Sequence, residues 1–234
     1  MEAPQPETWD FWSDGAHAPS FNMAADEVLL ETAPHRSRPL LRFYSWNTKA
    51  VSIGYFQQHT AAPAGYAYVR RPTGGGVVYH DFDFTYTVVF PEGHWLTGLD
   101  RNESYDWINR CIQTALDSLK VHATLAQGSI PHDVDRLTMV CFTNPPRYDV
   151  LLDGTKIAGS AQRRTADGIL HQGSLHFGGP LPFARAILGK AITDAFTQLM
   201  SVSFQEFVPD NALETLIQQK QETKYATKEW NDKR

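Results

Sequence analysis

The stretch at residues 70–81 constrains the fold of this chain more than any other. It reads RRPTGGGVVYHD: two arginines, a proline turn, three adjacent glycines, a β-branched run and a His-Asp pair. Glycine loses more backbone freedom on folding than any other residue, so such a run marks positive φ or a very close approach. The exposed N–H groups of such a loop suit a carbonyl, a carboxylate or a phosphate. A tight turn between two strands is the simpler interpretation, because glycine is the commonest turn residue.

The flanking arginines favour the ligand-binding interpretation of this loop. Arg70 and Arg71 place fixed cationic forks beside the backbone cradle, which suits a carboxylate or a phosphate. The loop lacks the GxGxxG spacing of a dinucleotide-binding fold, and the chain has no Walker sequence. Any use of ATP would therefore need an atypical phosphate site.

Composition excludes several classes of protein. A formal net charge of -5 over 234 residues argues against a general nucleic-acid binder. No run approaches the roughly 20 apolar residues of a membrane helix, and the first residues lack the basic and apolar regions of a signal peptide. The two cysteines, Cys111 and Cys141, form no disulfide framework. We therefore expect a cytoplasmic protein with reduced thiols, without a nucleic-acid or membrane partner.

The hydrophobic pattern predicts strands in the centre of the chain with helices interspersed. Two hairpins are predicted, residues 148–152 with 156–161 about Asp153-Gly154, and residues 162–165 with 169–177. Further strands are predicted near Trp9, as a short edge strand, and at 40–46, 50–54, 67–70 and 84–90. The predicted helices are a partly buried one at 23–31 capped by Asn22, one from Asn102, one with Pro182 in its first turn, and one capped by Asp210. We expect one α+β domain over residues 1–234, with a central mixed or antiparallel sheet flanked by helices.

Cys141 and Lys156 are the candidate reactive groups. Cys141 follows an apolar triplet and precedes a Pro-Pro turn. It is either a buried structural cysteine or a nucleophile whose pKa a nearby lysine lowers. Lys156 lies just past the first hairpin turn and precedes Gly159, and strand glycines indicate close approach of a backbone or ligand. A cation there would stabilise a thiolate or the oxyanion of acyl transfer, whereas the alternative is a solvated hairpin lysine.

The remaining candidates are less specific. Cys111 falls beside an apolar helical stripe and is expected to be a small buried hydrophobe. His80-Asp81 and His171 show no metal-ligand spacing, so no zinc site is predicted. No Gly-x-Ser-x-Gly elbow is present, which argues against an α/β-hydrolase.

Four motifs, taken together and in order, resemble the lipoate–protein ligase and octanoyltransferase superfamily, which is related to biotin–protein ligases. They are NMAADE at 22–27, the glycine stretch at 70–81, DGTKIAGSAQ at 153–162 and KYATKEWN at 224–231. The resemblance implies a biotin/lipoate ligase-like catalytic domain. It also implies an activity, the placing of a lipoyl or octanoyl group on one lysine of a lipoyl carrier domain, in the H protein or the E2 subunit of a 2-oxoacid dehydrogenase.

The same resemblance assigns roles to residues. The glycine stretch would line the acyl pocket and Lys156 would bind the acyl carbonyl. Cys141 and Lys156 are then the predicted catalytic residues, and no metal is expected. The predicted substrate-binding residues are Arg70, Arg71, Gly74, Gly75, Gly76, Val77, Tyr79, His80, Gly159, Ser160, Ala161, His171 and Gly173.

Members of the superfamily differ in their acyl donor. The stretch CF…PPRYDV at 141–150 resembles the Gram-positive-type octanoyltransferase that loads the H protein, in which this cysteine is the nucleophile. FTYT at 84–87 also resembles that branch, and the chain stops soon after Trp230, so no C-terminal accessory domain is expected. Gly76, in contrast, resembles the ligase form. LHQGS at 170–174 departs from the expected Gln-His-Gly-Ser order, which leaves the role of His171 open.

These features lead to three expectations for the activity. The first is octanoyl transfer from octanoyl–acyl carrier protein through a Cys141 thioester, with no cofactor. The second is an ATP-dependent lipoate–protein ligase that uses ATP and Mg, acts on free lipoate or octanoate, and has Arg70 and Arg71 facing phosphate. The third is a non-catalytic protein that binds an acyl group or a carrier domain.

Overall fold

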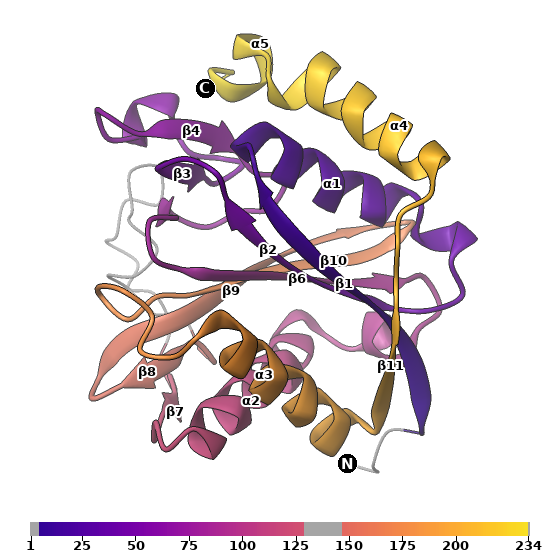
Figure 1. Ribbon diagram of the computed structural model, residues 1–234, viewed down its shortest axis with the longest axis vertical. Helices are drawn as coiled ribbons and strands as arrows, with labels where there is room; N and C mark the ends of the chain where they lie inside the picture. The colour runs from indigo at the N-terminus through magenta and orange to yellow at the C-terminus, as the bar shows by residue number, and fades with distance from the viewer. Residues whose placement is uncertain (1–4, 129–146, 234) are drawn as a thin grey trace.

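A mixed eight-stranded sheet forms the centre of the molecule (Figure 1). The computed structural model describes residues 5–128 and 147–233. The strand order is β11-β1-β2-β6-β10-β9-β8-β7, in which β1 runs parallel to both β11 and β2 and the other neighbours are antiparallel. The strands are β1 (Glu7–His17), β2 (Leu40–Trp46), β6 (Phe84–Pro91), β7 (Thr124–Leu125), β8 (Val150–Leu152), β9 (Thr155–Thr165), β10 (Gly168–Leu175) and β11 (Val202–Glu206). The predicted α+β class is confirmed.

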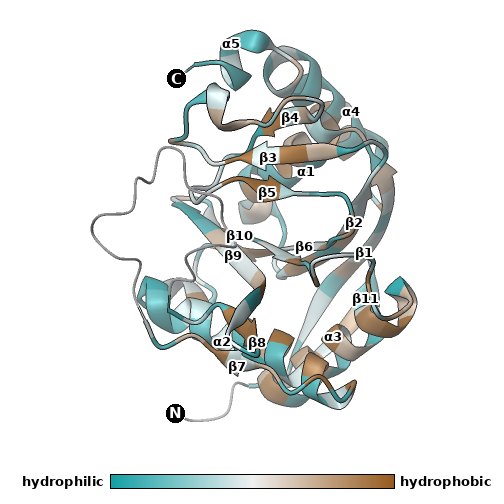
Figure 2. Ribbon diagram, turned by 90° about the vertical axis from the view of Figure 1, so that its left-hand side faces the viewer, coloured by the Kyte–Doolittle hydropathy of each residue, from teal (hydrophilic) through white to brown (hydrophobic). Residues whose placement is uncertain are grey.

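A second, three-stranded sheet carries the glycine-rich stretch. Its strands are β3 (Ala50–Ile53), β4 (Ala67–Arg70) and β5 (Val78–Tyr79), in the order β4-β3-β5. The glycines connect β4 to β5, and Figure 2 shows this small sheet on the α1 side of the large one. The loop is thereby placed over the large sheet and not at its edge.

Helices cover both faces of the large sheet. On one side lie α1 (Pro19–Glu31), α4 (Asn211–Lys220), the π-helical turn η4 (Gln221–Tyr225) and α5 (Lys228–Asn231). On the other side lie α2 (Arg101–Ser118) and α3 (Arg185–Met200). Three short 3₁₀ turns, η1 (Ala33–His35), η2 (His59–Ala61) and η3 (Trp95–Gly98), complete the described elements. Each helical layer closes its own apolar core against the sheet.

The first helix differs from its prediction at its start and in its burial. It begins at Pro19, whose fixed φ suits the first helical position, and not after Asn22. Asn22 is fully buried inside the helix, where its Nδ2 donates to the carbonyl of Ser45 at 2.9 Å. Residues 22–30 are all buried, because α4 and η4 cover the side of α1 that faces away from the sheet. The prediction of a partly exposed helix capped by Asn22 is therefore wrong.

Two other predicted elements need correction. The strand near Trp9 is not a short edge strand, because β1 has 11 residues and lies between β11 and β2. Pro182 does not open a helix, since α3 begins at Arg185. Both hairpins are confirmed, and they share the single long strand β9. Asp210 caps α4 as expected and accepts from the N–H of Leu213 at 2.8 Å.

Over the ranges 5–128 and 147–233, no helix is both long enough and apolar enough to pass through a bilayer.

Candidate active site

A groove lies where α1, the small sheet and strands β6, β9 and β10 meet. Its volume is about 430 Å³, including the part that is open to solvent. Both glycine-containing motifs, at 70–81 and 153–162, contribute to its wall. The residues that line it are Met23, Tyr44, Trp46, Ser52, Arg71, Gly75, Val78, His80, Thr85, Gly159, Ser160, Ala161, Gln172, Gly173 and Ser174.

The glycine loop lies directly on the backbone that follows β3. A Cβ at Gly54 would overlap the carbonyl oxygen of Gly75, so the two chains approach more closely than any side chain allows. Gly75 has a φ of 92°, in the region that favours glycine. The N–H of Tyr55 donates to the carbonyl of Thr73 at 2.8 Å and fixes the start of the loop. The prediction of a close backbone approach is confirmed for this loop.

Arg71 holds the loop from the inside. Its Nη2 donates to the carbonyls of Gly74 at 2.6 Å and Gly76 at 2.7 Å, and its Nη1 donates to the carbonyl of Ser52 at 2.9 Å. The guanidinium thus shapes the turn, while the side chain also lines the groove.

Arg70 lies elsewhere than predicted. It is fully buried, and its Nη1 donates to the carbonyls of Gly54, Tyr55 and Gln57 at 3.2, 3.1 and 2.5 Å. Its Nη2 donates to the carbonyl of Asn231 at 2.8 Å. A fully buried guanidinium needs acceptors, and here backbone carbonyls supply them. Arg70 therefore links three backbone segments and does not line the groove, where an arginine that binds phosphate was expected.

His80 belongs to a buried hydrogen-bond chain in the groove wall. Its Nδ1 lies 2.8 Å from Oδ2 of Asp83 and its Nε2 lies 2.9 Å from Oγ of Ser52. Its ring stacks on Trp46, with 3.8 Å between the centroids. Burial works to raise the pKa of Asp83, but the His80 ring together with hydroxyl donors holds that pKa below its ordinary value. The partner of the ring is Asp83 and not the adjacent Asp81, whose Oδ2 accepts from the hydroxyl of Tyr66.

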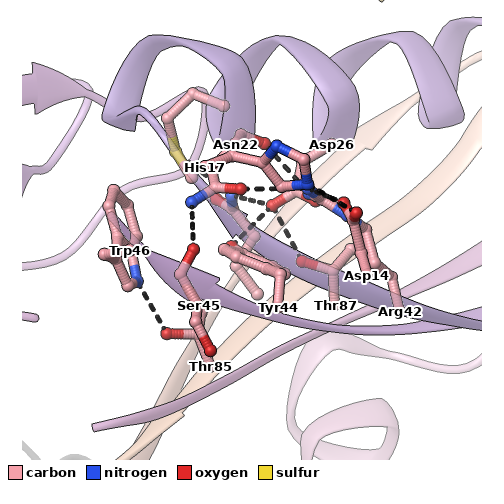
Figure 3. Close-up of polar contacts among 12 residues, drawn as sticks. Asp14, His17, Asn22, Asp26, Arg42, Tyr44, Ser45, Trp46, Thr85 and Thr87 are labelled. Carbon is pink, nitrogen blue, oxygen red and sulfur yellow. Dashed lines mark hydrogen bonds and ion pairs between the residues drawn. The ribbon is translucent and has the colours of Figure 1, made fainter. Parts of the chain in front are cut away.

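The polar cluster beneath the groove centres on Asp26 of α1 (Figure 3). Its carboxylate accepts from Nη1 of Arg42 at 2.7 Å, the hydroxyl of Tyr44 at 2.9 Å, Oγ1 of Thr87 at 2.8 Å and Nε2 of Gln172 at 2.7 Å. Every donor is buried, so both oxygens of the Asp26 carboxylate have hydrogen-bond partners away from water. The cluster explains the motif at 22–27, because Asp26 of this motif joins helix α1 to the strands beneath the groove.

Sequence reasoning missed this cluster. The available signal was an arginine in the middle of the apolar strand LLRFYSW, because a charge in a buried strand requires a partner. Arg42 has two, Asp26 and Asp14, the latter at 2.6 Å from Nη2.

Lys156 is buried beside the groove and pairs with Asp149, with Nζ 2.6 Å from Oδ2. A Cβ at Gly159 would overlap the end of the Lys156 side chain, so the ammonium lies over a residue of the groove lining. The alternative of a solvated hairpin lysine is therefore wrong. Asp149 was not predicted as its partner.

His171 lies outside the groove lining. It is fully buried on β10, where its Nδ1 is 3.1 Å from Nε2 of Gln162 and its ring faces Tyr86 and Tyr105. Burial lowers its pKa to about 3, so the ring is neutral. This placement gives no support to a direct contact with substrate.

The other predicted site residues divide into two groups. Gly75, His80, Gly159, Ser160, Ala161 and Gly173 line the groove together with Arg71. Gly74, Gly76, Val77 and Tyr79 flank it without lining it. Cys111 is a buried core residue whose pKa is raised by burial, as expected of a small hydrophobe. Cys141 lies outside the described residues.

Fold and groove together define the class of protein. The chain belongs to the lipoyl protein ligase A/B catalytic domain family, whose model matches residues 18–212.

Within this family the chain is similar to proteins named octanoyltransferase LipM. It is 36% identical over 181 residues to the one from Staphylococcus aureus, covering 72% of this chain and 66% of that relative. It is 30% identical over 272 residues to the one from Halalkalibacterium halodurans, covering 96% of this chain and 99% of that relative.

Solved structures show the same fold at low sequence identity. A putative lipoate protein ligase from T. acidophilum with bound lipoic acid has a TM-score of 0.81 and 20% identity, covering 97% of this chain and all of that one. A lipoate-protein ligase A bound with ATP also has a TM-score of 0.81 and 20% identity, covering 96% of this chain and 98% of that one. The mixed sheet with its flanking helices is thus a ligase-like catalytic fold.

Proposed function

We propose that this protein is an octanoyltransferase, an acyltransferase that places an octanoyl or lipoyl group on the lysine of a lipoyl carrier domain. The observation that carries this proposal is the similarity to octanoyltransferases at 30–37% identity, which for some extends over nearly the whole chain. The domain, taken as one unit over residues 1–234, supplies a groove whose lining combines apolar side chains with a few polar groups, as ligand sites commonly do.

The groove lining supports an acyl ligand. Met23, Trp46 and Val78 present apolar surface, while Gly75 and Gly159 let a chain approach the backbone. An acyl chain gains free energy mainly by leaving water for such a surface. The Lys156 ammonium near Gly159 marks the part of the groove that suits the carbonyl end.

The proposed reaction has two steps. The Cys141 sulfur attacks the thioester carbonyl of octanoyl–acyl carrier protein, and the carrier thiol leaves with the cysteine proton. The amine of the lipoyl-domain lysine then attacks the new thioester, forms the amide, and returns a proton to Cys141. Lys156 donates a hydrogen bond to the oxyanion in each step. The part played by Cys141 rests on the family resemblance.

The transferase is favoured over an ATP-dependent ligase. In an ATP-dependent ligase, Arg70 and Arg71 are expected to face the phosphate groups. Both guanidinium groups instead donate to backbone carbonyls. Octanoyl transfer from a thioester needs no nucleotide, so no cofactor is required. The proposed partners are an acyl carrier protein as donor and an H protein or E2 lipoyl domain as acceptor.

Reconstitution with purified components tests this function. The protein is incubated with an unmodified lipoyl domain and either octanoyl–acyl carrier protein or octanoate with ATP and Mg, and the lipoyl domain is then weighed by mass spectrometry. We expect the octanoyl adduct with the thioester donor alone. Modification only with octanoate and ATP would contradict the proposal and establish a ligase.

A further inference from the structure

Asp149 and Lys156 form a buried ion pair at one end of the large sheet, beside the groove. The exposed fractions of the two residues are 1% and 4%, and the charged atoms are 2.6 Å apart. Figure 1 shows β8, which begins just after Asp149, and β9, which carries Lys156, together with β7 at that edge.

An irregularity in β9 lies beside Lys156, whose side chain ends over Gly159 of the groove lining. Val150 pairs with Ala158, but Leu151 pairs with Lys156, so β9 contains one extra residue at this point. Such a bulge changes the direction of nearby side chains. Lys156 consequently extends over Gly159, where even a methyl group would overlap its Cε and Nζ.

Backbone hydrogen bonds fix the position of Asp149. The carbonyl of Asp149 accepts from the N–H of Ala126 at 2.8 Å, and the N–H of Tyr148 donates to the carbonyl of Ala126 at 2.8 Å. Tyr148 has a φ of 72°, a conformation that costs a bulky residue free energy. The chain thus holds Asp149 in place at some expense in backbone strain.

Stability alone is a poor reason for this pair. Burying two charges costs roughly as much as their attraction returns, and apolar residues of similar size often serve a fold equally well. Burial raises the pKa of Asp149 to about 6 although Lys156 and the N–H of Ser160 oppose that rise. A carboxylate that is this costly to keep charged, beside a lysine that reaches a residue of the groove lining, indicates a use for the charge of that lysine.

We propose that Asp149 is a positioning residue, which holds the Lys156 ammonium charged and aimed over Gly159 at the carbonyl oxygen of the acyl group. The inference rests on the proposed octanoyl transfer and assigns its orienting carboxylate. Asp149 itself forms no bond to the substrate and takes no proton from it.

The test begins with Asp149→Asn, which keeps the shape and removes the charge. We expect octanoyl transfer to the lipoyl domain to slow about 10- to 100-fold, the range seen when a group that orients a metal ligand is lost. The KM for the lipoyl domain should not change. Asp149→Glu, which keeps the charge, should recover part of the rate. Asp153→Asn is the matched control, because Asp153 is exposed in the same hairpin and its φ of 50° suits asparagine.

Two further readouts separate positioning from a merely structural role. The ratio of the wild-type rate to the Asp149→Asn rate should be constant above pH 7 and fall towards one as the pH drops through about 6, where Asp149 itself takes up a proton. In a Lys156→Gln background, Asp149→Asn should not lower the rate of octanoyl transfer any further. Thermal unfolding of each variant identifies any loss of rate that comes from a loss of folded protein.

Three outcomes would overturn the inference. They are a full rate in Asp149→Asn, the same loss in the Lys156→Gln background as in the wild type, and a rate ratio that does not depend on pH. Wild-type protein that transfers no octanoyl group would refute the proposed function, and the role of Asp149 with it, so the two failures are distinguishable.

Discussion

At the scale of single residues, glycine and histidine show how the groove wall is built. Gly54 and Gly75 bring two backbones together where no Cβ fits. His171 is held neutral in the core behind the groove. Gly54 and His171 each lead to a prediction about stability, and neither prediction depends on the proposed reaction.

Gly54→Ala should destabilise the protein by about 1–3 kcal/mol, the usual cost of forcing an extra methyl group into a packed site. The new Cβ would overlap the carbonyl of Gly75 and push the loop away from β3. Urea unfolding measures the change. Gly74→Ala is the control, because its Cβ would meet nothing within 4 Å, and it should change stability by less than about 0.5 kcal/mol. Equal effects of the two substitutions would contradict the described loop geometry.

His171→Phe should make stability less sensitive to acid. The pKa of His171 is lowered to about 3 in the folded protein from an ordinary value of 6.5. Between these values the unfolded chain binds a proton that the native chain does not. The native state therefore loses up to about 1.4 kcal/mol per pH unit as the pH falls below 6.5. Unfolding free energies from pH 7 to pH 4 should show this slope reduced in His171→Phe. They should show no reduction in His122→Gln, whose side chain is 85% exposed.

At the scale of elements, helix α5 fixes the end of strand β4, from which the glycine loop begins. Oδ1 of Asn231 accepts from the N–H of Arg70 at 2.8 Å, and Nε1 of Trp230 donates to the carbonyl of Arg70 at 2.9 Å. Nδ2 of Asn231 also donates to the carbonyls of Tyr225 and Thr227, both at 2.9 Å. The motif KYATKEWN thus has a structural reason, because it fixes the strand that leads into the groove.

Asn231→Ala should therefore cost about 1–3 kcal/mol, since it leaves the buried N–H of Arg70 without its acceptor. Hydrogen exchange of the amides at 70–76 should become faster in this variant. Glu229→Ala, which changes an exposed residue of the same helix, should leave that exchange unchanged. Unaltered exchange in Asn231→Ala would show that α5 does not hold the loop.

At the scale of the whole molecule, what the sequence could predict depended on the distance between partners along the chain. Local signals sufficed for the two hairpins, where Asp153-Gly154 sets the first turn, and for the capped start of α4. The interior position of β1 could not be predicted, because it depends on pairing with β11 near the other end of the chain. Burial of α1 likewise depends on α4.

The site followed the same rule. Glycine and lysine motifs identified much of the groove wall, since their composition carries the signal locally. Arg70 was misjudged because its acceptors come from residues 54–57 and 231. The partnership of Asp149 and Lys156 needed the bulge in β9, which no sequence pattern revealed.

The central claim, acyl transfer through a cysteine thioester, is tested most directly by the intact mass of the protein after incubation with octanoyl–acyl carrier protein without ATP. We predict an octanoyl adduct that hydroxylamine removes and that is absent from a Cys141→Ala control. No adduct on the wild type, with lipoyl-domain modification appearing only when free acid and ATP are supplied, would contradict the account and return Cys141 to a structural role.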